Sequence, residues 1–437
     1  MIKKISALIV CISVFLCLSG CDLMPADTAE LLSPPALSGD LKPIDDIIKQ
    51  TAGESYTLKY PSRGDFRSAI IREDINGDGS LEAFAFYYTT DGETGSMNIT
   101  AIAKKKDTWK SVASQKIVAG GVDKVDFCDL DDDGIKEILV GWEIYGTSEM
   151  QLAVYSLDEK NLVQKMLQRY THFDDCDLDQ NGKNEILIIK SATLEQTNSA
   201  ALFEISKNGV TQISACELDS TSKTINEPVF APLSNGTPAV YIDEIKGVGA
   251  VTEVLYFEKG ELKNPLFSTE TKETFATLRP VSLSLRDING DGIPEIPVQE
   301  NVPSVTSGEL NEILYLTNWC SFNGKTLTIQ KTAMVNVNDG FSFAIPVRLI
   351  GKIAVLKDTD NHLREIYLYD KIEKTVGKRI VSFKVFSLSD WKKKRESRSN
   401  AEVILKTETQ VFVCYLYEAA KNYDLTIETV KSNFSLF

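Results

Sequence analysis

A nine-residue acidic loop occurs four times in this chain and constrains its fold more than any other feature. In the copy that starts at Asp129, acidic side chains stand at the first, third, fifth and ninth positions, and Gly134 stands at the sixth. Such a loop gathers hard oxygen atoms around a turn that favours a positive φ, which suits Ca²⁺. The other intact copies start at Asp74, Asp177 and Asp287. Repeated spacing of this kind indicates a structural unit.

The interval between the loops predicts a fifth, degenerate copy near residue 231. The third and fourth intact loops start twice the usual interval apart. The segment 231–242 fills this gap, since it keeps Gly236 and a following apolar run but has none of the loop carboxylates. With this copy included, successive loops start 55, 48, 54 and 56 residues apart. That period is typical of propellers and solenoids.

Each period contains several segments with the composition of β-strands. An apolar run follows the ninth residue of every intact loop, so each loop is expected to open a strand. Around the second loop the predicted strands are 125–127, 138–145, 150–157 and 162–170. Four short antiparallel strands per period are typical of a propeller blade. A stacked β-helix is the alternative, although its coils are usually much shorter.

The predicted fold class is mainly β, with two folded parts. The first, at residues 55–336, is a β-propeller with about five visible four-stranded blades and calcium loops. Further blades at 301–336 or at the start of the chain stay open, and Tyr56 to Tyr60 is a candidate to close the ring and remove exposed strand edges. The second, at residues 337–437, is a small α+β domain with a predicted terminal helix from Thr426 to Phe437.

The amino-terminal segment has the features of an export signal. Lys3 and Lys4 precede an apolar run, Ile5 to Leu18, that is too short to span a membrane. The run ends in Leu18-Ser19-Gly20-Cys21, which resembles the bacterial lipobox. The resemblance implies a signal peptide at 1–20, acylation of Cys21 and an anchor with a proline-rich tether at 21–54. An ordinary signal peptide is the alternative.

The region just before the first loop contains two further features. Ile44, Ile47 and Ile48 have helical spacing and predict one short helix that serves packing. Arg63-Gly64-Asp65 matches the tripeptide that many integrins recognise, but a turn that leads into a strand is the favoured interpretation.

Charge and composition exclude some function classes and leave others open. The net charge of −15 and the lack of a basic stripe exclude a nucleic-acid partner. His172 and His362 are the chain's two histidines, and neither has the spacing of a metal site or a catalytic triad. We therefore expect a protein that is not an enzyme. Asp243 and Glu244, in the degenerate repeat, are the carboxylates with most catalytic interest, although solvent-facing charge is the favoured interpretation.

Cysteine spacing raises the question of a disulfide. Beyond Cys21, five cysteines remain, so they cannot all pair within one chain. Cys128 and Cys176 occupy the same repeat position, immediately before the first loop aspartate. Buried free thiols are favoured over a bond between them.

The loops, placed between the first two strands of each unit, resemble the FG-GAP and VCBS repeats of integrin α-subunit propellers and bacterial surface proteins. The resemblance covers about residues 56–336, and the whole chain resembles FG-GAP lipoproteins of low-GC Gram-positive bacteria. In that family, side chains at positions one, three, five and nine and the backbone carbonyl at position seven bind Ca²⁺. An EF-hand does not fit, because its glutamate stands at position twelve and helices flank it.

The resemblance implies up to four structural Ca²⁺ sites. Their side-chain ligands are Asp74, Asn76, Asp78 and Glu82 in the first loop; Asp129, Asp131, Asp133 and Glu137 in the second; Asp177, Asp179, Asn181 and Glu185 in the third; and Asp287, Asn289, Asp291 and Glu295 in the fourth. The degenerate copy departs from this pattern at Ala231, Leu233 and Ala239, so we expect no site there.

These features together predict an extracytoplasmic protein held on the bacterial cell membrane by its N-terminal lipid. The main functional hypothesis is a calcium-stabilised binding or scaffold module for a cell-wall glycan or a surface protein. The alternative is a hydrolase or lyase that acts on polysaccharide through carboxylates on the propeller face.

Overall fold

The computed structural model describes residues 41–437, except 54, 92–93, 107, 147–148, 159, 195, 306–313 and 394–399. The predicted signal peptide, the lipobox with Cys21 and most of the tether lie outside the described residues. Within the described part, we find no helix with the length and apolar character needed to cross a membrane.

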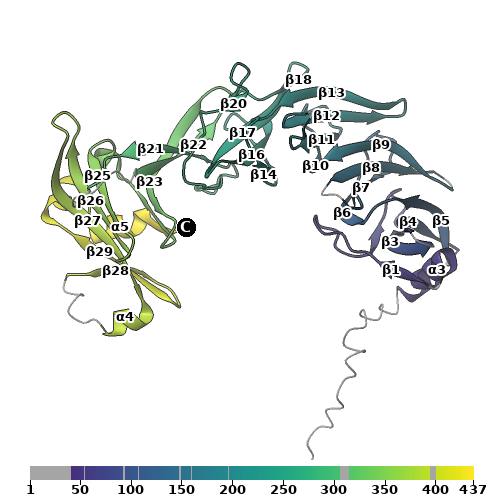
Figure 1. The fold of residues 1–437 in the computed structure, drawn as a ribbon, viewed down its shortest axis with the longest axis horizontal. Coiled ribbons are helices and arrows are strands. Elements are labelled where there is room, and N and C mark those ends of the chain that lie inside the picture. Colours follow the sequence, from purple (N-terminus) through teal and green to yellow (C-terminus); the bar gives the residue numbers. More distant parts are fainter. Residues whose placement is uncertain are drawn as a thin grey trace, which may run out of the picture.

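The chain folds mainly into antiparallel β-sheets that follow one another in sequence order (Figure 1). The first sheet contains β1 (Tyr56–Leu58), β2 (Ile70–Glu73), β3 (Glu82–Asp91), β4 (Thr94–Lys105) and β5 (Thr108–Ile117). The second contains β6 (Gly121–Cys128), β7 (Glu137–Glu143), β8 (Met150–Leu157) and β9 (Leu162–Tyr170). The third contains β10 (His172–Cys176), β11 (Glu185–Lys190), β12 (Ser199–Ser206) and β13 (Gly209–Glu217).

The next two sheets are less regular than the first three. The fourth contains β14 (Thr224–Ile225), β15 (Val229–Pro232), β16 (Pro238–Lys246), β17 (Gly249–Glu258) and β18 (Glu261–Lys263), and is followed by a small hairpin of β19 (Phe267–Ser268) and β20 (Glu273–Thr274). The fifth contains β21 (Ile296–Val302), β22 (Leu314–Phe322), β23 (Leu327–Asn336), β24 (Phe341–Ala344) and β30 (Phe434–Leu436). The fifth sheet therefore extends beyond residue 336, where the sequence repeat stops.

The C-terminal part is built on one further five-stranded sheet. Its strands are β25 (Ile353–Asp358), β26 (Leu363–Asp370), β27 (Thr375–Ser387), β28 (Glu402–Lys406) and β29 (Gln410–Leu416), accompanied by η1 (Val347–Leu349), α4 (Leu388–Lys393), η3 (Glu418–Tyr423) and α5 (Ile427–Asn433). The prediction of a terminal helix that reaches Phe437 is wrong in its last four residues. The helix ends at Asn433, because the following residues pair as β30 with the edge strand β24.

The predicted short helix before the repeats is confirmed as α3 (Lys42–Ala52). A proline stands in its first turn, and Gly53 follows its last residue with a φ of 78°. Ile44, Ile47 and Ile48 are buried and pack against Tyr87 and other core residues of the first sheet. This helix thus covers one face of the first sheet.

Neighbouring sheets are joined by hydrophobic clusters, and each middle sheet is buried on both of its faces. On β7, Ile138 and Val140 pack toward the first sheet, whereas Leu139 packs toward the third. Side chains of a strand alternate between the two faces of a sheet, so a strand covered on both sides is apolar at most of its positions. This double burial explains the uninterrupted apolar runs that follow the loops, and it confirms that each loop opens a strand.

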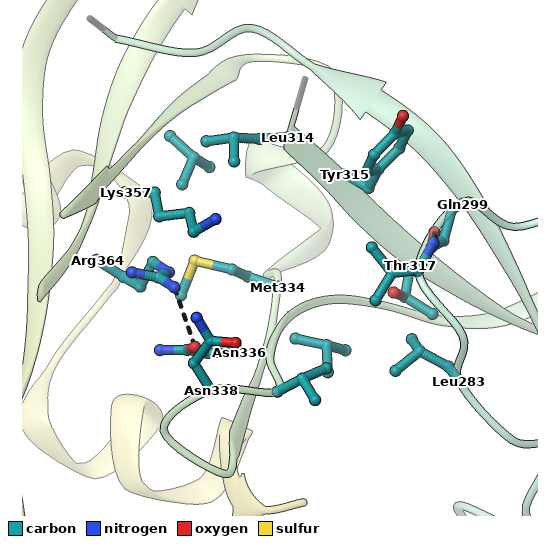
Figure 2. A pocket seen from close by; sticks show the side chains of 14 residues that line it. Leu283, Gln299, Leu314, Tyr315, Thr317, Met334, Asn336, Asn338, Lys357 and Arg364 are labelled. Atoms are coloured by element: carbon teal, nitrogen blue, oxygen red, sulfur yellow. Dashed lines mark hydrogen bonds between the residues drawn. The ribbon is translucent and has the colours of Figure 1, made fainter. Parts of the chain in front are cut away.

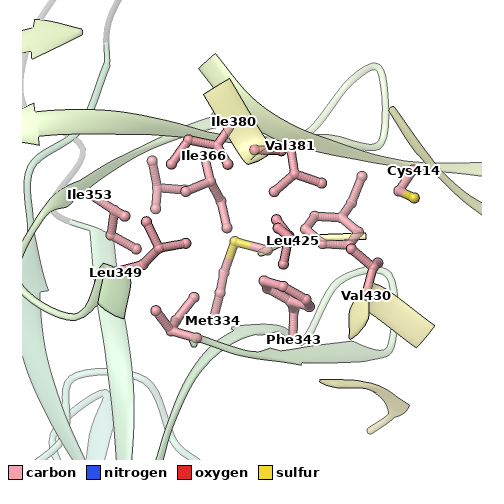
Figure 3. Close-up of a cluster of buried hydrophobic side chains, with 14 of the residues drawn as sticks. Met334, Phe343, Leu349, Ile353, Ile366, Ile380, Val381, Cys414, Leu425 and Val430 are labelled. Carbon is pink, nitrogen blue, oxygen red and sulfur yellow. The ribbon is translucent and has the colours of Figure 1, made fainter. Parts of the chain in front are cut away.

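The predicted closure of the ring by Tyr56 to Tyr60 is wrong. Strand β1 pairs with β3 of its own sheet, and Figure 1 shows a curved row of sheets whose two ends lie apart. The C-terminal part takes the place that the first sheet would occupy beside the fifth. One cluster buries Met334, Phe341 and Phe343 of the fifth sheet together with side chains of the C-terminal sheet and α5 (Figure 3). Because this contact covers the last sheet of the row, no ring closure is needed to bury it.

Candidate functional site

The intact loops lie between the first two strands of their repeats. The first three join β2 to β3, β6 to β7 and β10 to β11, and the fourth leads into β21 through a bridge between Arg286 and Glu295. Each loop turns at a glycine in the sixth position. These glycines, Gly79, Gly134, Gly182 and Gly292, have φ values of 84°, 86°, 88° and 82°. An L side chain rarely adopts this conformation, which accounts for glycine at that position in all four loops.

Two hydrogen bonds recur in all four loops. The first-position aspartate accepts one from the glycine amide, at 2.9, 2.9, 3.0 and 2.8 Å along the chain. The ninth-position glutamate accepts another from the amide of the second residue, at 3.2, 3.0, 3.2 and 3.0 Å. The glutamates are buried, with exposed fractions of 1 to 6%. The backbone thus turns the carboxylates at both ends of the loop toward one another.

The second and third loops gather their carboxylates most closely. Ligand oxygens of Asp129, Asp131 and Glu137 lie within 4.8 Å of one another, and the same holds for Asp177, Asp179 and Glu185. Among the described residues, the first and fourth intact loops do not bring three carboxylates this close. In the fourth loop, Asn289 donates hydrogen bonds to Asp291 and Glu295, at 3.0 and 3.1 Å.

The electrostatics of these loops fit a bound cation. Burial, opposed by the Leu130 amide and reinforced by the loop aspartates, raises the pKa of Glu137 to about 7. Burial and Asp179 raise the pKa of Glu185 to about 7 as well. Asp131 Oδ1 is buried and accepts no hydrogen bond from any residue that the structure describes. A hard cation such as Ca²⁺ would offset the repulsion between these carboxylates and would give the unpartnered oxygen a ligand bond.

Neighbouring loops are connected directly. The amide of Lys136 in the second loop donates to the carbonyl of Ile75 in the first at 2.7 Å, and the Lys136 ammonium lies 2.6 Å from Glu73. Lys183 in the third loop lies 3.4 Å from Asp132 in the second. The first three loops therefore lie next to one another.

The degenerate loop keeps the turn without the acidic residues. Gly236 has a φ of 88°, and its neighbour Leu233 is buried in the apolar contact with the fifth sheet. The second position of this loop is Pro232, which has no amide proton to donate to a ninth-position residue. The amide of the third residue, Leu233, donates to the Thr237 carbonyl at 2.8 Å. The degenerate loop is therefore stabilised by apolar packing against the fifth sheet.

A further acidic group lies between the second and third sheets. Asp126, Asp174 and Asp175 have oxygens within 4.8 Å of one another. The Lys124 ammonium lies 3.2 Å from Asp174 and 3.7 Å from Asp126, so this group already has a cation from the chain.

The favoured solvent-facing interpretation of Asp243 and Glu244 is wrong, because both side chains are buried in the fourth sheet. Asp243 forms an ion pair with the fully buried Arg279 at 2.7 Å and accepts a hydrogen bond from Thr252 at 2.5 Å. Burial and the adjacent Glu253 carboxylate raise the pKa of Glu244. Neither acid is available on a surface for catalysis.

The remaining residues of interest have structural surroundings. Cys128 and Cys176 are free thiols, as expected, and so are Cys216, Cys320 and Cys414. His172 is buried and lies 2.9 Å from the Ile225 carbonyl. Arg63 is half-buried, and it pairs with Asp123 at 2.7 Å, so the arginine of the Arg-Gly-Asp tripeptide is committed to an internal contact.

A pocket of about 170 Å³ lies between the fifth sheet and the C-terminal sheet (Figure 2). Figure 2 shows Lys357 and Arg364 on one side of it and Gln299, Tyr315 and Thr317 on the other. Gln299 and Thr317 share a face because they are paired across β21 and β22. Arg364 is buried and donates to Asn336 Oδ1 at 3.1 Å. Sequence reasoning missed this site, since its residues come from strands that are distant in sequence.

Comparisons with known proteins give distant structural matches. Neither a protein-family model nor a curated protein matches the sequence. A rhamnogalacturonan lyase from Bacillus licheniformis has 14% identity and a TM-score of 0.31, over 55% of this chain and 59% of the lyase. A periplasmic gluconolactonase from Pseudomonas aeruginosa has 12% identity and a TM-score of 0.29, over 75% and 88%. An exo-β-1,3-galactanase from Phanerochaete chrysosporium has 9% identity and a TM-score of 0.26, over 79% and 81%.

These matches correct one expectation. The sequence contains no catalytic motif and led us to expect a protein that is not an enzyme, yet the similar solved structures named above are all enzymes. We therefore withdraw that prediction. At these TM-scores the matches assign no activity to this chain.

Proposed function

We propose that this protein binds Ca²⁺ in its four intact loops. The observation that carries the proposal is the convergence of three carboxylates in the second and third loops, where Asp131 Oδ1 is buried without a partner. The residues that would hold the ions are the sixteen loop side chains named in the sequence analysis. A bound ion would supply positive charge that offsets the repulsion within each loop, and the chain would supply the rigid turn.

Calcium binding is tested by calorimetry and thermal melting of residues 22–437. After chelation, adding Ca²⁺ should raise the melting temperature, because the ion binds the folded state alone. Equal melting temperatures with and without Ca²⁺ would disprove the proposal. Mg²⁺ at the same concentration serves as the control, since it demands near-ideal octahedral geometry and gives up its water ligands reluctantly.

We also propose that the protein is exported and anchored by lipid on Cys21, outside the cytoplasmic membrane. The sequence before residue 41 supports this: a charged start, a short apolar run and a lipobox-like tetrad. Replacing Cys21 by serine should move the protein from the membrane fraction to the soluble fraction. Membrane retention of that variant would contradict the anchor.

For the partner, we propose an acidic polysaccharide bound at the pocket between the fifth and C-terminal sheets. What supports this is that two cations, Lys357 and Arg364, line one pocket together with the amide and hydroxyl groups of Gln299, Asn336 and Thr317. Guanidinium groups bind carboxylates well, and amides and hydroxyls suit sugar hydroxyls. Binding of a wall glycan and cleavage of the same glycan would both use this site.

Binding is tested by calorimetry with a polyuronate and, as the control ligand, a neutral glucan of similar length. Lys357→Gln and Arg364→Gln should each weaken polyuronate binding about tenfold, the effect expected for the loss of one charged contact. Arg348→Gln, which removes an exposed arginine elsewhere in the C-terminal part, is the matched control. Equal binding by all four proteins would rule out this pocket.

A second candidate function is cleavage of the same polysaccharide. Lys357 favours it, since a lysine can exchange a proton and stands in one pocket with Arg364, which would hold a substrate carboxylate. In an elimination of this class, a base removes the proton next to the carboxylate and the departing oxygen takes up a proton. Incubation with a polyuronate should then give unsaturated products that absorb in the ultraviolet, and Lys357→Gln should abolish them.

A further inference from the structure

The interior of the fourth sheet contains a group of oxygen atoms without hydrogen-bond partners. Glu244 on β16 is fully buried, and neither of its carboxylate oxygens has a partner among the described residues. The Ser222 hydroxyl lies against this carboxylate and is also buried and unpartnered. Asn264 Oδ1 is a further oxygen of this kind. Buried polar atoms nearly always have a partner, so such a group requires an explanation.

The neighbouring carboxylate of Glu253 accepts the hydrogen bonds that this region offers. Glu253 accepts hydrogen bonds from the Asp219 amide at 3.0 Å, from Asn264 Nδ2 at 2.9 Å and from the Thr274 hydroxyl at 2.7 Å. Asn264 therefore turns its amide nitrogen to Glu253 and leaves its oxygen without a donor. Glu253 is satisfied, whereas Glu244 beside it is not.

The nearby cation does not neutralise this pair. The Lys246 ammonium lies 2.8 Å from Asp219 and 2.6 Å from Glu273, so it is shared between two other carboxylates. Among the described residues, Glu244 and Glu253 thus bring two acidic groups together in the interior without an ion-pair partner. Burying a carboxylate in this way costs several kcal/mol unless it is paired or protonated.

We propose that the oxygens of Glu244, Glu253, Ser222 and Asn264 form an internal binding site for a hard divalent cation, with Ca²⁺ as the expected ion. Glu244 supplies two oxygens, and the other residues supply a carboxylate, a hydroxyl and an amide oxygen. This set contains no nitrogen or sulfur, which favours Ca²⁺ over transition metals.

The position of the site in the row is consistent with this assignment. Glu244 shares a face of β16 with Ile242, which packs against the third sheet. The fourth repeat is also the one whose loop has lost its carboxylates. The internal site would place an ion within that repeat at a different position, independent of the four loop sites.

A single shared proton is the competing explanation. A proton on Glu244 would neutralise one charge and make one hydrogen bond to Glu253. It would leave Asn264 Oδ1 without a donor, whereas a divalent ion neutralises both charges and engages the whole oxygen set. The two explanations differ in the number of ions that the chain holds.

The test counts bound Ca²⁺ by native mass spectrometry of residues 22–437, for the wild type, Glu244→Gln and Glu270→Gln. Glu270 is exposed on the same part of the chain and serves as the matched control. Glu244→Gln should bind one ion fewer than the wild type, and Glu270→Gln should bind the same number. Removal of a loop ligand as well, in Glu137→Gln/Glu244→Gln, should lower the count by two.

An unchanged ion count in folded Glu244→Gln overturns the proposal and assigns a proton to the pair. If Glu244→Gln does not fold, Ser222→Ala provides the test, because it removes a ligand oxygen without removing a charge. This variant should weaken one ion about tenfold, and unchanged affinity at every site would overturn the proposal. If the four loops bind no Ca²⁺, the wild type should still hold one ion, and Glu244→Gln should hold none. The ion count therefore distinguishes failure of the loop sites from failure of the internal site.

Discussion

Arg63 forms a two-pronged ion pair with Asp123, a residue 60 positions further along the chain. Its Nε lies 2.8 Å from Oδ1 and its Nη2 lies 2.7 Å from Oδ2 of that carboxylate. The same guanidinium reaches the Thr171 carbonyl at 3.2 Å. Arg63 Nη1 also lies 3.3 Å from Nδ1 of His172, the first residue of β10. One side chain from the segment before the first loop therefore connects the second and third sheets.

We predict that Arg63→Ala lowers the free energy of unfolding by about 3 kcal/mol, because it leaves the buried Asp123 carboxylate without its cation. Denaturant titration measures the change. Arg169→Ala, which breaks an exposed ion pair with Glu149, is the control and should cost less than about 1 kcal/mol. Similar losses in the two variants would show that the Arg63 contact has no special role.

Glu137→Gln should remove the ion of the second loop and leave the other loops able to bind. The reason is that Glu137 is both a proposed ligand and the acceptor for the Leu130 amide. Asn235→Ala, in the degenerate loop, should leave the ion count unchanged. Native mass spectrometry counts the ions, and the loss of an ion from Asn235→Ala would contradict the structural role of that loop.

The stability of the metal-free protein should fall as pH rises from about 5 to about 7.5. The folded-state pKa of Glu137 and of Glu185, about 7, lies above the ordinary value of 4.5. Folding therefore takes up protons, and the stability gained this way is complete below 4.5 and is lost as pH rises through 7.

Saturating Ca²⁺ should reverse this trend, because the ion competes with the same protons. Thermal melts across this pH range, in chelator and in Ca²⁺, provide the measurement. Parallel pH profiles in the two conditions would argue against Ca²⁺ binding at these glutamates.

Phe434→Ala should destabilise the joint between the fifth sheet and the C-terminal sheet by about 3 kcal/mol. The Phe434 ring stacks on Phe341 at 5.2 Å and lies 5.6 Å from Phe412. Hydrogen exchange should show faster exchange at β24, whose edge β30 protects. Leu436→Ala, at a half-exposed position of the same strand, is the control and should change little.

Local features of the fold were predictable from the sequence. The position of each loop, the strand after it and the helix that contains Ile44 depend on residues within a few positions of one another. The degenerate copy near 231 was located by the repeat interval and recognised by Gly236 and the apolar run after it. Apart from that interval the signals are short-range, because turn glycines and apolar runs act on their own stretch of backbone.

Long-range features were not predictable in the same way. The pairing of Phe343 with Phe434 joins strands that lie far apart in the sequence, and nothing in either strand specifies its partner. This pairing is why the predicted ring closure failed. The burial of Asp243 depends on Arg279 in a separate loop, and the pocket depends on two sheets meeting.

The burial of each middle sheet on both faces limits how this chain can change in evolution. Loss of part of a repeat would expose buried apolar side chains on both neighbouring sheets. Loss of a complete repeat would instead bring the apolar faces of those two sheets into contact. Such a chain is expected to vary in length by complete units, with its two ends kept.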